Sequence, residues 1–265
     1  MNATLIERIV AVFQFEWRRA LTWPRMTWMA TLALFPPALL LLMRWTAGSF
    51  EIPWQGAAIA IFALAPSIAC IMAVFLWATP SISSELEGRS WVYLAVRPDG
   101  PVAVLLGKYL AAVTWALPVG LIASTLSTLV LVREQVLRML VVQNSLAILS
   151  CIAYAAVFLL IGVIVPKRAM VVGIIYGILF EAAASTIPAA INLITIQHRL
   201  RCLLVRGLGF DESMAEDNVV FQAYFGQGSL LWHTGILLAM TLAFLVIAVA
   251  ILRWREFTTA SETDT

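Results

Sequence analysis

Few residues in this chain have the types and spacing that chemistry requires. His198 and Cys202 are four residues apart, a spacing that places both on one face of a helix and would suit a pair of metal ligands. Two ligands do not make a metal site, so we interpret them as an isolated histidine and cysteine of a loop. Cys70 and Cys151 fall inside apolar runs, and no disulfide framework follows from the three cysteines.

The pair Gly107-Lys108 invites comparison with a phosphate-binding loop. A Walker A loop also requires a glycine five residues before its second glycine, and serine or threonine after the lysine. Those positions hold Val102 and Tyr109 here. The chain is therefore not expected to bind ATP, and we interpret Lys108 as a lysine near a helix start that reaches toward lipid head groups.

Glu181 is the one acidic residue inside a long apolar run. Gly173, Gly177 and Glu181 follow one another at intervals of four, which predicts one helix face on which small residues permit close packing. A charge facing lipid costs at least about 2.5 kcal/mol, so Glu181 should face protein or water. Two interpretations stay open: it lines a pathway or gate, or it makes a structural hydrogen bond between helices.

Composition indicates the solvent in which these residues work. The chain is 62% hydrophobic and 12% charged, whereas soluble domains are about 45–50% apolar and about 25% charged. A net charge of +2 is too small to favour nucleic acid as a partner. These values predict a membrane protein.

The lengths of the apolar runs predict an all-α membrane protein with six transmembrane helices, since about 20 apolar residues cross the hydrocarbon. We expect one domain over residues 1–265, in which an interfacial helix (1–25) precedes a six-span bundle (26–254) and a tail (255–265). The predicted spans are 27–45, 57–79, 103–132, 139–165, 169–194 and 229–253.

The N-terminal segment predicts an amphipathic helix that lies along the membrane surface. Pro24 separates it from the first span, although it could instead be an extension of that span. Phe13 and Trp17 belong to its apolar face, and Arg18 and Arg19 to its polar face. The apolar face as a whole comprises Ile6, Ile9, Val10, Phe13, Trp17 and Leu21.

Basic residues predict the orientation. With both termini in the cytoplasm, eleven lysines and arginines lie inside and six lie outside, so the positive-inside rule favours cytoplasmic termini in the cell (inner) membrane. The inner set is Arg8, Arg18, Arg19, Arg25, Arg89, Arg97, Lys108, Lys167, Arg168, Arg253 and Arg255, and the outer set is Arg44, Arg133, Arg138, Arg199, Arg201 and Arg206.

Residues 83–100 then face the cytoplasm, and they are longer and more polar than a connector needs to be. Ser84 followed by Glu87 forms a capping box, which predicts that a short surface helix starts there. The turn at residues 98–101 ends that helix. Such a helix could transmit force from a cytoplasmic partner, or it could be an idle interfacial hairpin.

The string ELEGRSWVYLAVRPDGPVAVLLGKYLAA resembles the first cytoplasmic loop of ABC-2-type transporter permeases. That family also has an amphipathic N-terminal helix, six spans and a long outer segment between the last two, which corresponds to residues 195–228. The family usually has threonine after the glycine, where this chain has Arg89-Ser90. The matching residues are Glu85, Glu87, Gly88, Ser90, Arg97, Pro98, Gly107 and Lys108.

The resemblance implies that this loop is a coupling helix for a separate ATPase, with contacts from Glu85, Glu87, Gly88, Arg89 and Ser90. It implies a transport subunit rather than an enzyme, paired with a second permease chain, as a homodimer in preference to a heterodimer, and with two ATPase copies. This chain would hold no cofactor, because ATP and magnesium bind the ATPase. The alternative is a stand-alone carrier or a membrane-embedded enzyme.

Overall fold

The computed structural model describes residues 4–47, 53–87, 99–183, 192, 194–210 and 228–254, and within these ranges the chain contains helices and no strand. Within the described residues five helices are long and apolar enough to cross a membrane, which indicates a multi-pass all-α membrane protein. They cover Trp23–Thr46, Trp54–Glu85, Gly100–Leu131, Val136–Ile164 and Leu230–Trp254. Five of the six predicted spans are therefore present as long helices.

The two helices at the centre of the bundle are α7 (Gly100–Leu131) and α8 (Val136–Ile164). Their most apolar windows are 67% and 72% buried, whereas those of α2 (Trp23–Ala47) and α13 (Leu230–Trp254) are only 22% buried. The outer helices present apolar side chains outward, and an apolar exterior of this kind is stable in lipid rather than in water.

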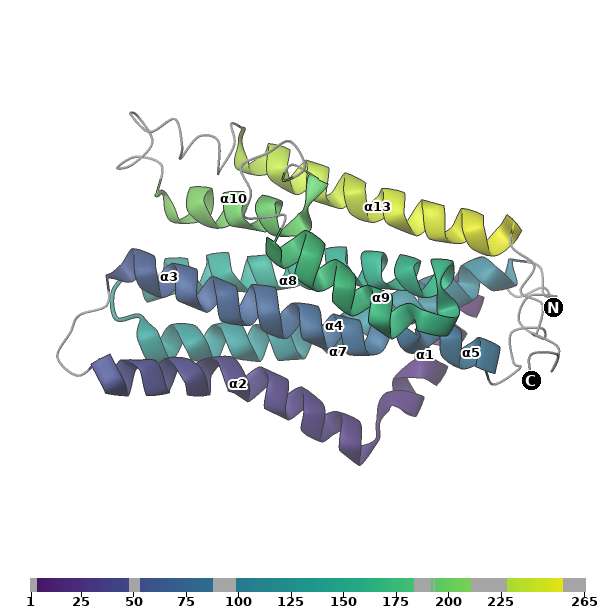
Figure 1. Cartoon of the computed structure of the whole chain (residues 1–265), viewed down its shortest axis with the longest axis horizontal. Coiled ribbons are helices and arrows are strands. Elements are labelled where there is room, and N and C mark those ends of the chain that lie inside the picture. Colours follow the sequence, from purple (N-terminus) through teal and green to yellow (C-terminus); the bar gives the residue numbers. More distant parts are fainter. Residues whose placement is uncertain are drawn as a thin grey trace.

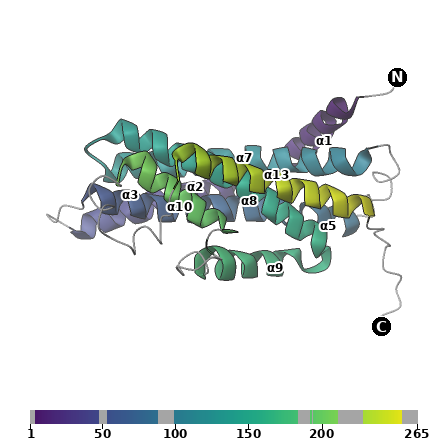
Figure 2. The same cartoon turned by 90° about the horizontal axis from the view of Figure 1, so that it is seen from above.

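The long helices run side by side along the longest axis of the molecule (Figure 1). The first turns of α7, the last turns of α8 and α13, and α5 (Pro80–Glu87) lie at one end, which we call the α5 end. The α7–α8 turn and α10 (Ile196–Leu208) lie toward the opposite end, which we call the α10 end. Figure 2 shows α1 (Leu5–Ala20) projecting obliquely from the α5 end.

The second long helix changes its winding near its middle. It comprises α3 (Trp54–Phe62), a π-helical segment η1 (Ala63–Ala69), α4 (Cys70–Ala78) and α5. Pro66 lies inside the π segment, and proline is tolerated within a membrane helix when neighbours satisfy the backbone groups that it disturbs. Ser150 of α8 donates a 2.7 Å hydrogen bond to the Pro66 carbonyl, which ties the π segment to α8.

The fifth predicted span, 169–194, is described over residues 169–183, 192 and 194. The chain turns after α8 through a short 3-10 helix, Pro166–Arg168, and continues as α9 (Ala169–Ile175) and a π-helical segment η3 (Tyr176–Ala183). These fifteen residues give about 22 Å of α-helical length, against about 30 Å of hydrocarbon. Residues 184–191 and 193 lie outside the described residues, so the prediction that this span continues to residue 194 stays a prediction.

Part of the predicted outer segment, 195–228, is helical and packs against the bundle. Residues 196–208 form α10, which begins at a Thr195 cap and packs between α8 and α13. Nine of its residues are buried, including Ile196, Leu200 and Leu204 at successive intervals of four. An apolar stripe at that spacing explains why a stretch rich in arginine folds against the bundle. Residues 211–227 lie outside the described residues.

The N-terminal helix is a separate element rather than an extension of the first span. Thr4 and Glu7 form a capping box at its start, and the chain breaks at Leu21 before α2 begins at Trp23. Pro24 occupies the second position of α2, where a missing N–H costs nothing. Ile6 of the predicted apolar face is 72% exposed, as a side chain that faces lipid would be, and Val12 packs against α7 at Gly107.

Candidate functional site

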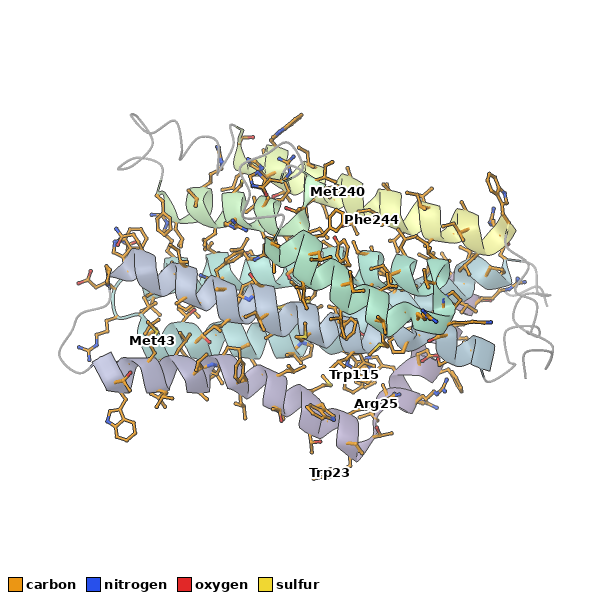
Figure 3. All side chains as sticks on the ribbon, in the orientation of Figure 1. Trp23, Arg25, Met43, Trp115, Met240 and Phe244 are labelled. Carbon is orange, nitrogen blue, oxygen red and sulfur yellow. The ribbon has the colours of Figure 1, made fainter. Side chains whose placement is uncertain are left out.

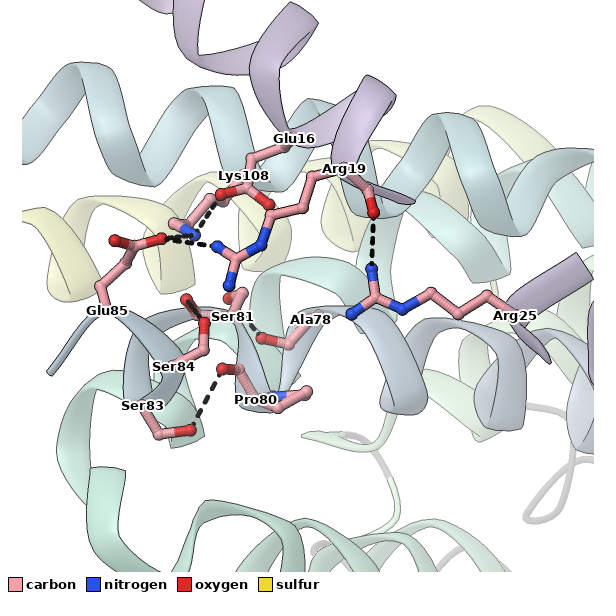
Figure 4. A network of polar contacts seen from close by, with 10 residues as sticks. All are labelled: Glu16, Arg19, Arg25, Ala78, Pro80, Ser81, Ser83, Ser84, Glu85 and Lys108. Carbon is pink, nitrogen blue, oxygen red and sulfur yellow. Dashed lines mark hydrogen bonds and ion pairs between the residues drawn. The ribbon is translucent and has the colours of Figure 1, made fainter. Parts of the chain in front are cut away.

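Four charged side chains from three elements meet at the α5 end, and we call them the ionic cluster: Glu16, Arg19, Glu85 and Lys108 (Figure 4). Lys108 Nζ of α7 lies 2.6 Å from Glu16 Oε1 of α1 and 3.0 Å from Glu85 Oε1 of α5. Arg19 Nη1 reaches the same Glu85 oxygen at 3.4 Å. The Lys108 and Glu85 side chains are only 2% and 8% exposed, so this is a buried ion-pair network.

Local sequence explains how these side chains meet. Asp99 adopts a left-handed backbone (φ 55°), and Pro101 follows in the first turn of α7, so that the helix starts sharply and carries Lys108 two turns in. Gly107 allows α1 to come close, because a Cβ atom there would lie 2.7 Å from Val12 Cγ1. Glu16 is one turn beyond Val12 on α1, which places its carboxylate beside Lys108.

Three expectations for this region are wrong. Glu85 was expected on an exposed surface helix, but it is 6% exposed and ion-paired. Lys108 was expected to reach lipid head groups, but it is 3% exposed and bonded to two carboxylates. Ser84 does not cap a helix, because α5 starts at Pro80 and the Ser84 hydroxyl donates to the Ser81 carbonyl. The second long helix continues as far as Glu85, and this brings the glutamate next to α1.

The other predicted coupling residues lie where α5 ends. Glu87 is the last residue of α5. Gly88, Arg89 and Ser90 fall within 88–98, outside the described residues, so their predicted contact with an ATPase stays a prediction. The chain enters this segment directly from α5 and leaves it directly into α7, and both helices carry members of the ionic cluster.

The predicted interface residues of α1 have different surroundings. Arg18 is exposed and Phe13 is half-buried. The Trp17 ring stacks on Trp115 of α7 with centroids 4.8 Å apart, and Trp115 stacks on Trp77 of α4 at 5.4 Å. Three tryptophans from α1, α7 and α4 thus lie in one stack beside the ionic cluster.

Arg25 completes this arrangement. Its guanidinium lies 4.9 Å from the Trp77 ring centroid, which is a cation–π contact, and Nη1 donates to the Arg19 carbonyl at 3.4 Å. A pocket of about 100 Å³ opens between the tryptophans and the charged side chains. Its walls are Glu16, Arg19, Ala20, Arg25, Leu76, Trp77, Pro80, Ser81, Ser84, Lys108, Ala111, Ala112 and Trp115.

Glu181 lies at a second polar site, inside the bundle. It is 2% exposed and accepts hydrogen bonds from the hydroxyls of Tyr154 (2.8 Å) and Tyr176 (2.5 Å). It also accepts from the backbone N–H groups of Ile196 (3.3 Å) and Gln197 (2.9 Å), at the N-terminus of α10. A carboxylate there satisfies free N–H groups and is stabilised by the helix dipole. These contacts are those of a structural hydrogen-bonding residue.

The two glycines that precede Glu181 differ. A Cβ atom on Gly173 would lie 2.7 Å from Phe75 Cε2, so α9 and α4 are closely packed there. Among the described residues, no atom lies within 4 Å of the corresponding position at Gly177, so none of them packs closely against that glycine. The winding becomes π-helical at Tyr176, so an interval of four no longer returns to one face.

His198 and Cys202 are both buried in α10, with His198 Nε2 3.5 Å from Cys202 Sγ. Burial and the neighbouring Arg199 and Arg201 charges lower the pKa of His198 to about 4, and burial raises the pKa of Cys202 to about 11. His233 of α13 lies 3.3 Å from an Arg199 nitrogen. Within the described ranges, no three histidine, cysteine or acidic side chains are grouped to hold a metal.

Glu16, Trp77, Trp115 and Arg25 were not anticipated as site residues. Of these four, only Glu16 could have been noticed in the sequence. It follows Val12 and Phe13 by four and three residues, so it lies on the same helix face, and Val12 on that face packs against α7. From the sequence alone, the tryptophans fit an aromatic belt at the membrane surface as well as they fit a site. Their stacking depends on contacts between helices that are distant in the sequence.

Comparison with known proteins does not assign a family to this site. No family model matches the chain, and no curated protein matches it.

Proposed function

We propose that this chain is the transmembrane subunit of an ATP-driven exporter of the ABC-2 type. The segment 88–98 docks on a separate ATPase, which binds ATP and magnesium, and two permease chains form the path. The layout supports this proposal, since a separate amphipathic helix precedes a bundle of membrane-length helices. The excess of basic residues favours a cytoplasmic position for the α5 end, which the proposal requires.

The ionic cluster is the observation that carries the proposal. Lys108 joins α1 through Glu16 and joins α5 through Glu85, and α5 and α7 are the two helices that flank the docking loop. A displacement of that loop by ATP binding would therefore move α1, the second span and the third span together. A connector without a mechanical role does not require a buried ion pair between its flanking helices.

The test uses the tagged chain expressed with its genomic neighbours. Glu85 is unsuitable for charge reversal, because its loss would break the ionic cluster. Reversal of Glu87 and Arg89 together, Glu87→Lys with Arg89→Glu, should release the ATPase or uncouple ATP hydrolysis from transport. Arg18→Glu on the exposed face of α1 tests whether α1 braces the ATPase without removing Glu16.

Glu134→Lys is the matched control, because Glu134 is exposed in the α7–α8 turn at the α10 end. It should leave ATPase co-purification and ATP hydrolysis at the wild-type level. Wild-type coupling in the Glu87→Lys, Arg89→Glu variant would refute docking through this loop. If no ATPase co-purifies with the wild-type chain, the alternative holds, namely a stand-alone carrier or a membrane-embedded enzyme.

A further inference from the structure

The pocket beside the ionic cluster is lined by three basic side chains and one carboxylate. Arg19, Arg25 and Lys108 supply the positive charges, and Glu16 supplies the negative one. Glu85 adds a second carboxylate through its pairs with Lys108 and Arg19. Three positive charges face two negative charges, so the group carries one positive charge in excess.

Arg25 is the cation whose charge is not balanced. Within the described part of the chain it has no acidic partner, and its interactions are the cation–π contact with Trp77 and the bond from Nη1 to the Arg19 carbonyl. A guanidinium has five N–H donors, so most of those on Arg25 stay available. Figure 3 shows Arg25 and Trp115 between α2 and the helices that it packs against, and both side chains line the pocket.

The chemistry of the pocket fits one kind of anion. A guanidinium fork matches the oxygens of a phosphate group, which it binds through two parallel hydrogen bonds. The single excess charge matches a phosphodiester, which carries one negative charge. Indole rings favour the depth of lipid head groups in a bilayer, and the nearby Trp23 and Trp28 are 82% and 64% exposed.

An apolar strip leads away from the pocket along the second span. Leu76 lines the pocket and is 41% exposed, and Met72 and Ile68 follow at intervals of four with exposures of 39% and 45%. At 1.5 Å per residue this strip is about 12 Å long. Its length and direction suit the part of an acyl chain nearest to a head group that occupies the pocket.

We propose that this pocket binds the phosphate of an anionic phospholipid such as phosphatidylglycerol, with Arg25 as the principal ligand. The acyl chain lies on Leu76, Met72 and Ile68. The bound lipid neutralises the excess charge and holds the start of α2 against α1 and α4. This proposal requires only that the chain resides in a bilayer, so it is independent of the exporter function.

The experiment measures lipid binding to the full chain in detergent by native mass spectrometry. Phosphatidylglycerol, phosphatidylethanolamine and inorganic phosphate are titrated separately. We expect one tightly retained phosphatidylglycerol, weaker retention of phosphatidylethanolamine because its ammonium offsets the phosphate charge, and no competition from millimolar inorganic phosphate. Arg25→Gln should weaken phosphatidylglycerol binding at least about tenfold, since charge-assisted hydrogen bonds are lost.

Lys167→Gln is the matched control, because Lys167 is an exposed cation in the turn at the α5 end, outside the pocket. It should bind phosphatidylglycerol as the wild type does. Arg25→Lys keeps the charge without the fork and should bind with intermediate affinity, and it serves if Arg25→Gln does not fold. Wild-type binding by Arg25→Gln, an equal loss in Lys167→Gln, equal retention of phosphatidylethanolamine, or displacement by inorganic phosphate would each overturn the proposal.

Discussion

Lys108 and Glu16 are 92 positions apart in the sequence, and their Nζ and Oε1 atoms lie 2.6 Å from each other. The lysine is buried in the third long helix and the glutamate belongs to the amphipathic helix that precedes the first. Through its second partner, Glu85, the same ammonium also holds the end of the second long helix. One side chain thus joins three separate elements at the α5 end.

Lys108→Gln should destabilise the protein strongly. The substitution leaves Glu16 and Glu85 close together without their shared cation, and removal of one partner from a buried ion pair costs about 3–5 kcal/mol. The free energy of unfolding of the purified chain, measured by denaturant titration in detergent, is expected to fall by about that amount.

Arg19→Gln is the control for Lys108→Gln. The Arg19 side chain is 47% exposed and its contact with Glu85 is 3.4 Å, so solvent screens the interaction and the expected loss is about 0–1 kcal/mol. Equal losses in the two variants would show that the burial of Lys108 contributes nothing beyond an ordinary surface pair.

Glu181→Gln should lower stability by about 1–3 kcal/mol, measured in the same titration. An amide retains one acceptor oxygen, but its NH₂ group cannot accept from the backbone N–H groups of Ile196 or Gln197. Tyr154→Phe removes one of the donors to Glu181 and should cost about 1 kcal/mol. A Glu181→Gln variant that unfolds like the wild type but fails in transport would assign the residue to the pathway instead.

Gly162→Ala should be destabilising by about 1–3 kcal/mol. The added Cβ would lie 2.7 Å from the Thr79 carbonyl oxygen, so α8 and the α4–α5 junction would have to separate. Gly235→Ala in α13 is the matched control, since no atom of the described residues lies within 4 Å of its Cβ position and alanine favours a helix by up to about 1 kcal/mol. A Gly162→Ala variant as stable as Gly235→Ala would contradict this close approach.

Stability should fall as the pH drops from about 6.5 toward 4, in part because of His198. Its pKa is lowered to about 4 in the folded chain, against 6.5 when exposed, so in this window the unfolded state binds a proton that the folded state does not. Between pH 7 and pH 5 the contribution reaches at most about 2 kcal/mol.

His198→Gln isolates this contribution, because the other titrating groups are common to both proteins. The variant should lose less stability than the wild type when the pH is lowered from 7 to 5. An identical pH dependence in the two proteins would mean that His198 takes up its proton equally readily in the folded and unfolded states.

The long helices could be predicted from the sequence because the length of an apolar run is a local property. Residues 103–132 and 139–165 correspond closely to α7 and α8. The separate helix before Pro24 was also predictable, since its cap and its break are set by neighbouring residues. The apolar stripe of α10 is also set by local spacing, but it was missed because arginines alternate with the apolar residues and make the segment look polar.

The site could not be predicted in the same way, because charge alone does not indicate which side chains meet. Glu85 and Lys108 looked like exposed residues near a membrane surface, but they pair with each other and α1 packs over Gly107 beside them. The interval between Gly173, Gly177 and Glu181 assumed α-helical winding throughout. The π segment that begins at Tyr176 changes that winding, and short-range propensity does not signal it.

The ionic cluster also sets an order on biosynthesis. Ribosomes synthesise the chain from its N-terminus to its C-terminus, so Glu16 and Glu85 are made before Lys108. A nascent chain that ends before residue 108 therefore carries both carboxylates without the ammonium that they share in the finished protein. The second long helix acquires its link to α1 through Lys108 only after translation has entered the third.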